Sequence, residues 1–577
     1  MIKDFKKIRA LLPREQKRAL IILSGLLLVG MFLEILGLGI LLPILTILLN
    51  PEQLSNVLAH FTFIDLKAFN YNDVVVFSLF SLFFVYIFKT LFLVFINYKQ
   101  NVILENTGIS IQNKLFSNQL YRSYEHHLYR DFSEIIKDVQ LEVFFFISFC
   151  RSLIMFFVEF ALVIAILATI LYLEPQGALV IGSIFGVLGF FFLQLSKKKL
   201  KVWGEEREVL DGKILKTLTN SLSGIKEVKL FHKEAYFINM LKENNTRKAK
   251  ISANFQTLSQ IPRFYLELIT IIGMVVLILV LFYNGIKTTE IVTLLGVFVA
   301  AAFRMIPSIN RILSALQNIK FYGSTVKKIY DQIIGYNYSK SNLNFKKFSF
   351  NKEIKLEGIQ FSYKEKKILN STNLEIKKGT TIGVVGPSGS GKSTLVDLIN
   401  GLLKPLKGSV SVDGTNIDEI IKPWQQSLGY VGQEIFLMDD TIKANIAFGV
   451  IDQEININNI YKALDAAQLS TFIDELKLGI NTRVGERGIQ LSGGQKQRLG
   501  IARALYRNPS ILIFDEATAS LDHETEKQVM NSIYNLKQNK TMIIIAHRIS
   551  TLNHCDKVYE VKNGNIKLKE LEWTKTS

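Results

Sequence analysis

Six long apolar stretches divide this chain and set its organisation. Each is about as long as a helix that crosses a bilayer and carries few charges. They lie at about 19–49, 74–97, 152–173, 177–195, 264–283 and 291–312. The pattern therefore predicts six membrane-spanning helices.

The polar segments between the stretches alternate in charge. The N-terminal segment "MIKDFKKIRALLPREQKR" and segments 98–142 and 196–263 are rich in Lys and Arg. The other connecting segments are nearly free of basic residues, with only Lys67 and Lys287 in 50–73, 174–176 and 284–290. Basic segments stay in the cytoplasm. We therefore predict a multi-pass protein of the cell inner membrane with both termini in the cytoplasm. No cleavable signal peptide is expected, because the first apolar stretch is too long and lacks a cleavage site.

The long basic segments contain few glycines or prolines, so we expect the membrane helices to continue into the cytoplasm. Turns are expected near 124–136 and 218–231. Plain cytoplasmic loops are the alternative. In the first outer segment, Leu54, Val57, Leu58 and Phe61 follow helical spacing. They predict either a short helix on the outer membrane surface or a loop packed on neighbouring helices.

Composition supports a membrane protein with a second, water-soluble part. Hydrophobic residues make up 49% of the chain, and Phe occurs 41 times. After residue 350 the apolar stretches give way to short β-branched strands and polar helices. We expect a six-span α-helical transmembrane domain at 1–315, a linker at 316–350 and an α/β P-loop domain at 351–577. The net charge of +18 fits a basic cytoplasmic face, so no nucleic-acid partner is expected.

A glycine-rich loop stands between a strand and a helix in "TTIGVVGPSGSGKSTLVDLI". Gly386-x-x-x-x-Gly391-Lys392-Ser393 in this context is the pattern of a phosphate-binding loop. Glycines let backbone N–H groups approach the phosphates, and the helix N-terminus adds its positive end. We expect Lys392 to reach the β- and γ-phosphates and Ser393 to bind Mg²⁺.

Two acids end an apolar strand in "ILIFDEATASLD". Asp515 can hold the Mg²⁺ shell. Glu516 can orient or deprotonate the attacking water. A plain acidic turn is the alternative, and the phosphate loop at domain-scale separation upstream disfavours it.

The octapeptide "LSGGQKQR", residues 491–498, resembles the signature motif of the ATP-binding cassette (ABC) family. The resemblance covers the whole chain, since six spans followed by one nucleotide-binding domain resemble a half-size type IV ABC exporter. It implies ATP and Mg²⁺ as cofactors and ATP hydrolysis coupled to transport. The residues that match the family's ATP-binding motifs are Tyr363, Gly386, Ser388, Gly389, Ser390, Gly391, Lys392, Ser393, Thr394, Gln433, Ser492, Gly493, Gly494 and Gln495.

Particular roles follow from the same resemblance. Tyr363 in "FSY" resembles the aromatic that stacks on adenine. Gln433 in "YVGQEIF" resembles the Q-loop residue, which would join Ser393 and Asp515 around Mg²⁺. His547 in "IIIAHR" resembles the switch histidine that contacts the γ-phosphate. The expected catalytic residues are therefore Glu516, His547 and Lys392.

The signature also implies a dimer. The helix that begins near Ser492–Gly494 is an anion site without a ligand of its own. In the family, two domains pair head to tail so that each signature covers the partner's ATP. A chain with one such domain needs a second chain, and a homodimer is the simplest expectation.

Four basic residues near the cytoplasmic ends of the spans are candidates for substrate binding. They are Lys89, Arg263, Arg304 and Arg311. Arg304 and Arg311 are two helical turns apart and share a face, and Arg binds phosphate oxygens bidentately. The alternative is structural: Arg263 pairs with Glu267, and the arginines pair with Glu34, Glu159 or another acid.

These residues suit an anionic amphiphile. "PRFYLE" and "FRMIPSINRI" resemble segments of bacterial lipid-linked oligosaccharide flippases, the PglK-like branch. The expected function is ATP-driven export or flipping of a phosphate- or pyrophosphate-linked glycolipid. A lipid A-type glycolipid also fits. An exporter of peptides, toxins or drugs is the alternative within transport, and an ATP-gated channel or regulator is the alternative outside it.

Overall fold

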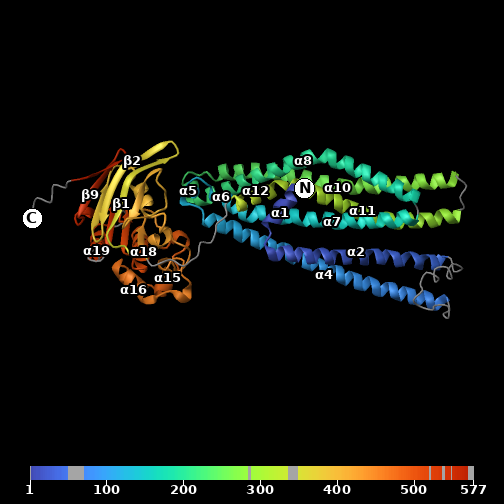
Figure 1. The fold of residues 1–577 in the computed structure, drawn as a ribbon, viewed down its shortest axis with the longest axis horizontal. Coiled ribbons are helices and arrows are strands. Elements are labelled where there is room, and N and C mark those ends of the chain that lie inside the picture. The colour runs from blue at the N-terminus through green and yellow to red at the C-terminus, as the bar shows by residue number, and fades with distance from the viewer. Residues whose placement is uncertain are drawn as a thin grey trace, which may run out of the picture. The chain divides into compact units, whose positions relative to one another are not determined.

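The structure, a computed structural model, divides into two compact units (Figure 1). One unit contains Met1–Arg122 and Tyr129–Ser339, and the other contains Ser123–Leu128 and Lys340–Ser577. The described residues are 2–49, 71–173, 175–283, 288–335, 348–518, 522–535, 540–546 and 549–569. The expected outer surface helix near 54–61 and His547 lie outside them.

The first unit consists, in its described residues, of helices joined by short turns. Its six long helices are α2 (Arg14–Leu49), α4 (Tyr71–Leu120), α7 (Val143–Leu173), α8 (Pro175–Ser223), α10 (Glu234–Tyr283) and α11 (Thr288–Phe321). Its short helices are α1 (Ile2–Leu11), α6 (Phe132–Lys137), the π-helix η3 (Asp138–Glu142), α9 (Ile225–Leu230) and α12 (Gly323–Ile334). Each of the six predicted spans falls within one long helix. The expected linker begins inside α11 and includes α12.

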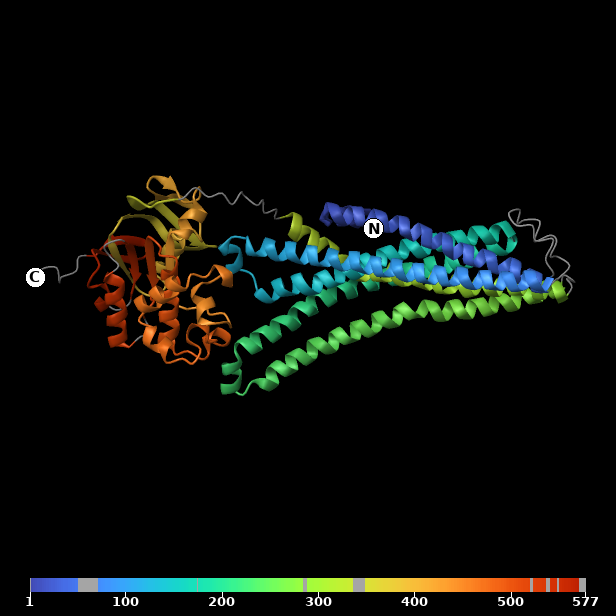
Figure 2. The same ribbon diagram turned by 90° about the horizontal axis from the view of Figure 1, so that it is seen from below.

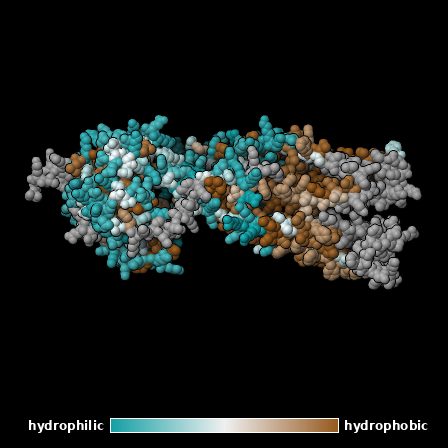
Figure 3. Space-filling view, in the orientation of Figure 1, coloured by the Kyte–Doolittle hydropathy of each residue, from teal (hydrophilic) through white to brown (hydrophobic). Residues whose placement is uncertain are grey.

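Hydrophobic surface gathers over the part of this unit that contains the spans and gives way to hydrophilic surface toward α6 and α12 (Figure 3). Among the described residues, four helical segments are long and apolar enough to cross a membrane: Arg14–Glu34, Val75–Leu120, Phe132–Ala168 and Glu234–Val276. In α8 and α11, much of the apolar stretch lies where side chains are not described.

The long helices extend well beyond a bilayer. α4 has 50 residues, so it is about 75 Å long, against a hydrocarbon core of about 30 Å. The breaks come where the sequence predicts turns, at α5 (Tyr124–Leu128) and α6, and at α9. α8 and α10 lie side by side and are joined through α9, and Figure 2 shows this pair diverging from the other helices toward α9.

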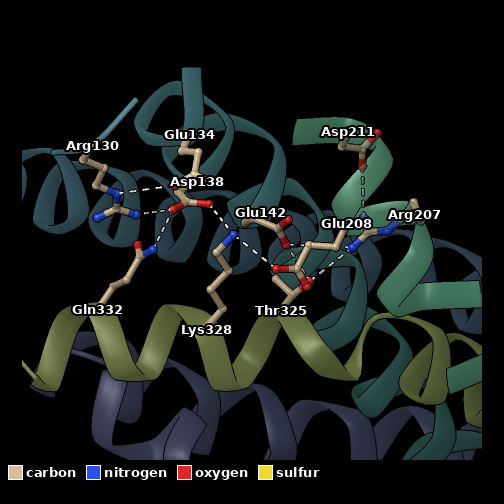
Figure 4. Close-up of polar contacts among 10 residues, drawn as sticks. All are labelled: Arg130, Glu134, Asp138, Glu142, Arg207, Glu208, Asp211, Thr325, Lys328 and Gln332. Carbon is tan, nitrogen blue, oxygen red and sulfur yellow. Dashed lines mark hydrogen bonds and ion pairs between the residues drawn. The ribbon is translucent and has the colours of Figure 1, made fainter. Parts of the chain in front are cut away.

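A buried carboxylate ties α12 to the start of η3 (Figure 4). Asp138 is 2% exposed. One of its oxygens accepts hydrogen bonds from Arg130 at 2.8 Å and from Gln332 of α12 at 2.6 Å. Its other oxygen lies 2.7 Å from the Lys328 ammonium, also on α12. The buried charge thus holds α12 against a segment that lies 194 residues earlier in the chain.

Lys328 connects this carboxylate to α8. Its ammonium lies 3.1 Å from Glu208 as well as close to Asp138. Burial by itself would lower the pKa of Lys328, but the hydrogen bond and the charge of Asp138, with Glu208, raise it above its ordinary value. Lys328 therefore carries its positive charge at neutral pH.

A second buried pair continues the network. The Thr325 hydroxyl donates to Glu142 at 2.8 Å, and Arg207 of α8 lies between Glu142 and Asp211 (Figure 4). The Arg207 guanidinium also stacks 3.6 Å from the centre of the Phe145 ring. Buried ion pairs are costly to break because the remaining partner stays buried and charged.

The second unit is an α/β fold built on two sheets. The six-stranded sheet has the order β10-β9-β3-β8-β7-β6. Its strands are β3 (Thr381–Val385), β6 (Leu428–Val431), β7 (Ile511–Asp515), β8 (Thr541–Ile545), β9 (Lys557–Lys562) and β10 (Asn565–Leu568). All neighbours are parallel except β10 and β9. The helices that pack on this sheet include α13 (Lys392–Ile399), α18 (Gly493–Tyr506) and α19 (His523–Asn535).

The second sheet is antiparallel, with the order β2-β1-β4-β5. Its strands are β1 (Glu353–Tyr363), β2 (Lys366–Lys377), β4 (Lys407–Val412) and β5 (Thr415–Asn416). Shorter helices complete the unit: α14 (Ile421–Gln426), α15 (Ile442–Ile446), α16 (Ile457–Ala466) and α17 (Ser470–Asp474), with 3-10 turns at Asp452–Glu454, Gly479–Asn481, Glu486–Gly488 and Ile549–Leu552. Mostly apolar residues, many of them β-branched, fill β3, β7 and β8. β7 and β8 are buried along their whole length, and β3 is buried at all but its last residue, Val385. This is the pattern of parallel strands covered on both faces.

Asp138→Asn should lower the apparent midpoint of thermal unfolding, because Lys328 and Arg130 would lose a buried anionic partner. Losing one member of such a network costs roughly 3 to 5 kcal/mol. Glu134→Gln is the matched control, since Glu134 lies 3.9 Å from Arg130 and its side chain is 56% exposed. Equal midpoints for the two variants would contradict the role given to Asp138.

Candidate functional site

The glycine-rich loop joins β3 to α13, as the sequence predicts. Gly386 and Gly391 have φ of 154° and 106°. A Cβ at Gly386 would overlap the Val561 carbonyl oxygen, and one at Gly391 would come within 2.9 Å of the Ile368 side chain. Both glycines are therefore needed for the backbone to make this turn. Ser388 and Gly389 are exposed at the tip of the loop.

Lys392 begins α13 and turns back across the loop. Its ammonium donates hydrogen bonds to the carbonyl oxygens of Gly386 at 2.9 Å and Pro387 at 3.1 Å. This positions the charge over the backbone N–H groups that a phosphate would bind. Thr394 is buried beneath the loop, and the Ser390 hydroxyl is buried without a hydrogen-bond partner in the described part of the chain.

Asp515 ends β7 and faces the start of α13. The Ser393 hydroxyl donates a hydrogen bond to its carboxylate. Burial, together with the negative charge of Glu516, raises the pKa of Asp515, while Ser393 and Lys392 oppose that shift. A hydroxyl and a carboxylate held together are the hard oxygen donors that Mg²⁺ prefers. The two residues expected to bind the metal are thus adjacent.

Glu516 follows at the end of the strand in an unusual backbone conformation. Its φ is 51°, in the left-handed region that a residue with a side chain rarely adopts. Its N–H donates to the Ile545 carbonyl at 3.0 Å, which anchors it to β8. Its carboxylate accepts a hydrogen bond from the Gln433 amide at 2.9 Å. Strained residues of this kind concentrate at functional sites.

The signature residues form the start of α18. The Ser492 hydroxyl accepts from the Gln495 N–H at 3.2 Å, and the Gln495 side chain accepts from the Ser492 N–H at 2.8 Å. This reciprocal arrangement is a capping box. Gln495 therefore has a structural task in addition to any contact with nucleotide. The N–H groups of Gly493 and Gly494 are left at the positive end of the helix.

Tyr363 lies at the end of β1, where the strand turns into β2. Its ring packs edge-on against Phe361, with 4.9 Å between ring centres. The side chain is half-buried.

Arg503 and Glu526 position segments of the site, although no motif in the sequence identifies them as site residues. Arg503 of α18 donates to the Phe436 carbonyl at 2.7 Å and to the Asn445 carbonyl at 2.7 Å, tying the segment after Gln433 to the signature helix. Glu526 of α19 is buried and accepts hydrogen bonds from Thr518 at 2.9 Å and Thr551 at 3.0 Å. Glu526 thereby holds the segment after Asp515 next to the segment after β8.

The short helix α5 belongs to the second unit although it lies between α4 and α6 in sequence. Tyr124 of α5 lies close enough to Asp397 of α13 for that charge, after burial, to raise the tyrosine's pKa. Burial and then Asp515, Asp397 and Tyr124 raise the pKa of Tyr430. The segment that leaves the membrane domain is thus next to the residues that follow the phosphate loop.

The expected substrate-binding cations are in ion pairs wherever their side chains are described. Lys89 lies 3.1 Å from Glu34 and Arg311 lies 2.7 Å from Glu159. Glu34, Glu159 and Arg311 line one cavity of about 180 Å³. The Arg311 side chain is 41% exposed.

The other two cations do not join this cavity in the described structure. Arg263 pairs with Glu267 of the same helix at 2.9 Å, on an exposed face. Arg304 lies on α11, one turn from Pro307, and its side chain is outside the described structure. The Arg263–Glu267 and Arg311–Glu159 pairs are those of the structural alternative, whereas Glu34 pairs with Lys89. Whether these cations also bind substrate stays a prediction.

Comparison with known proteins gives the family. Residues 20–306 match the model of the ABC transporter transmembrane region, and residues 369–519 match that of the ABC transporter. The chain is also 32% identical to the ATP-dependent lipid A-core flippase of Saccharophagus degradans over 405 residues, 69% of this chain and 67% of the relative. The chain is an ABC transporter. Its fused membrane and nucleotide-binding domains make it a half-size exporter, and the predicted fold class and coupled ATPase activity are confirmed.

Other relatives extend the similarity along the chain. The ATP-dependent lipid A-core flippase of Cupriavidus pinatubonensis is 26% identical over 474 residues, 81% of this transporter and 80% of the relative. A bacterial Atm1-family ABC exporter, solved with ATP bound, superposes with a TM-score of 0.77 at 22% identity, covering 96% of this chain and 94% of that one. The second similarity concerns the fold. Together they describe a multi-pass membrane protein that binds ATP and uses it for export.

Asp397→Asn should stabilise the nucleotide-free protein at pH 8 and leave its stability unchanged at pH 4. Burial and the charge of Asp515 raise the pKa of Asp397 to about 6. The folded state therefore binds a proton more tightly than the unfolded state, so stability falls as pH rises from about 4 to 6 and stays reduced above it. The expected gain at pH 8 is on the order of 1 to 3 kcal/mol, measured as the unfolding midpoint across pH without Mg²⁺. A constant offset at all pH values would contradict this assignment.

Proposed function

We propose that this transporter flips an anionic glycolipid across the bacterial inner membrane, with a lipid carrying a phosphate- or pyrophosphate-linked oligosaccharide as its cargo. The observation that carries the proposal is the similarity, over both domains, to relatives named lipid A-core flippases. The resemblance of "PRFYLE" and "FRMIPSINRI" to lipid-linked oligosaccharide flippases supports the same chemical class. In both cases the cargo joins an anionic head to apolar chains.

The ion pairs around the small cavity fit this cargo. Each of the two ion pairs has zero net charge. One joins Lys89 to Glu34, and the other joins Arg311 to Glu159. An anionic headgroup would exchange with Glu159 for the Arg311 guanidinium, which stays partly exposed. Such exchange keeps the Arg311 cation paired at each stage, which lowers the cost of moving an anion through a low-dielectric region. Arg304, two turns away on the same helix, would supply the second charge.

A homodimer supports this function. Half-size ABC exporters function as dimers, and the α18 N-terminus here is a positive helix end. The hairpin tip at α9 carries exposed large apolar residues, namely Leu222, Ile225, Leu230 and Phe231. Exposed apolar clusters of this kind mark protein interfaces, and a second copy of the chain is the partner that the family architecture provides.

Each residue of the nucleotide site has a distinct role in the proposed function. Lys392 and the loop N–H groups would bind the phosphates, and Ser393 with Asp515 would hold Mg²⁺, which neutralises charge on the phosphates. Gln433, whose amide nitrogen is bound to Glu516, would present its oxygen to the metal. Glu516 would accept the proton of the attacking water. Movement of Gln433 and of α5 would transmit closure to the helices of the membrane domain.

Glu516→Gln should bind ATP normally but hydrolyse it at least about 100-fold more slowly, because an amide cannot act as a general base. Phosphate release and nucleotide affinity are the two measurements. Glu524→Gln is the control, since this exposed acid lies on α19, beyond the loop that follows Glu516. Hydrolysis at the wild-type rate in Glu516→Gln would contradict the role of Glu516.

Arg304→Ala and Arg311→Ala should fold and hydrolyse ATP but lose flipping of a pyrophosphate-linked polyprenyl lipid in proteoliposomes. Arg304→Lys should keep part of the activity, since the charge remains but the bidentate fork is gone. Glu159→Gln distinguishes cargo binding by Arg311 from a purely structural role of the ion pair, because it removes the carboxylate partner and keeps the Arg311 side chain. If Arg311 binds cargo, Glu159→Gln keeps flipping.

Other outcomes of this experiment are equally informative. If the Arg311–Glu159 pair only holds helices together, Arg311→Ala and Glu159→Gln should both lower the unfolding midpoint and impair transport alike. A stable Arg304→Ala protein that flips normally would contradict the proposed cargo path. Transport of a cationic peptide or drug in place of the lipid would favour the alternative exporter function.

A further inference from the structure

A second cavity of the helical unit lies outside the nucleotide site and adjoins the Glu34–Arg311 cavity, with which it shares Leu27 and Val158. It has a volume of about 580 Å³ and lies between α1, α2, α4 and α7. Leu23, Leu104 and Leu153 are buried at its base, whereas Phe5 and Phe157 are exposed at its edge. The cavity is therefore an apolar groove that opens on the side of the helical unit.

The groove has the length of one membrane leaflet. Along α2 it extends from Lys17 to Leu27, a rise of about 15 Å in an α-helix. This is half of the roughly 30 Å hydrocarbon core of a bilayer. Lys17 belongs to the basic segment that precedes the first span, which the charge pattern places on the cytoplasmic side. Judged along α2, the groove thus starts at the cytoplasmic headgroup level and extends toward the middle of the bilayer, and Leu104 and Thr107 line it from the part of α4 just beyond the predicted end of its span.

The polar end of the groove is positively charged. Arg9 of α1 and Lys17 of α2 line it there, and no Asp or Glu is among the described residues that line it. The remaining lining is almost entirely apolar, with Ser24 and Thr107 as the polar exceptions. Both of these hydroxyls donate to carbonyls one turn back in their own helices, Leu20 at 2.8 Å and Ile103 at 2.8 Å, so they demand no polar ligand.

We propose that this groove is a binding site for an anionic phospholipid of the cytoplasmic leaflet, with its phosphate on Arg9 and Lys17 and an acyl chain along α2. Cations beside an apolar slot of leaflet length match the charge and the length of such a lipid. A free phosphate would leave the apolar part empty, and an uncharged alkyl chain would leave the cations without a partner. The bound lipid would fasten α1 to three spans. This site is independent of the nature of the transported cargo.

The test measures the binding of dioleoylphosphatidylglycerol to the full-length protein in detergent by native mass spectrometry. The wild-type chain should bind one molecule tightly, and dioleoylphosphatidylcholine should bind about tenfold more weakly. Arg9→Gln with Lys17→Gln should weaken phosphatidylglycerol binding roughly tenfold to thirtyfold, since two cations near the headgroup are lost. Millimolar inorganic phosphate should not displace the lipid.

Two matched controls distinguish the groove from general attraction to a basic surface. Lys6→Gln with Arg14→Gln removes the same charge from exposed residues of the same region that do not line the groove, and should leave binding within about twofold. Ser24→Phe should fill the groove and reduce binding, whereas Gly25→Phe, at a neighbouring position with open space around it, should not. Phosphatidylglycerol should also raise the unfolding midpoint of the wild type but not of Ser24→Phe.

Three results would overturn the proposal. Equal loss in the Lys6/Arg14 control would show general electrostatic attraction. Equal affinity for phosphatidylcholine would show an unselective apolar slot. Absence of a tightly bound lipid on the wild-type chain would show that the groove is covered by something else, such as the second copy of the chain.

Discussion

A bilayer offers no hydrogen bonds to a peptide backbone, and this constraint shapes the helical unit of the protein. Each span must satisfy its own N–H and C=O groups, so each is a continuous helix. Once a helix has formed, adding further residues costs little, and α4, α8 and α10 extend far beyond the apolar stretch. The rods that result place α5 and α9 at their far ends. The great length of these helices thus follows from the solvent in which their spans lie.

The same scarcity of water governs the charges of the helical unit. Lys89 and Arg311 each lie against a carboxylate of another helix, and Asp138 serves three donors at once. Unpaired charges in such places would cost several kcal/mol each. Pairing therefore selects which helix faces meet, and it makes α12 a fixed part of the membrane unit. The charge pattern predicts that the cations lining the groove of α1 and α2 lie at headgroup level, where water and lipid phosphate are available.

In the nucleotide-binding unit the candidate catalytic and phosphate-binding residues lie at one edge of a parallel sheet. β3, β8 and β7 are neighbours in the same direction, so the phosphate loop, Asp515 and the segment after β8 meet at their carboxyl ends. The register that opposes Asp515 to Ile545 lets the Glu516 N–H bond the Ile545 carbonyl. That bond and Gln433 hold Glu516 in its left-handed conformation. Strand pairing thus stabilises the strained backbone conformation of Glu516.

The sequence by itself determined the features that depend on local pattern. Spans follow from the length of apolar stretches, and the loop at Gly386–Ser393 follows from glycine spacing between a strand and a helix. Tertiary structure alone decided that Lys89 pairs with Glu34 rather than facing an open cavity, that Arg503 fastens the segment after Gln433, and that α5 belongs with the second unit. These contacts join residues tens to hundreds of positions apart. Their distances are set by how whole helices and strands pack, and a pattern of neighbouring residues carries no information about such packing.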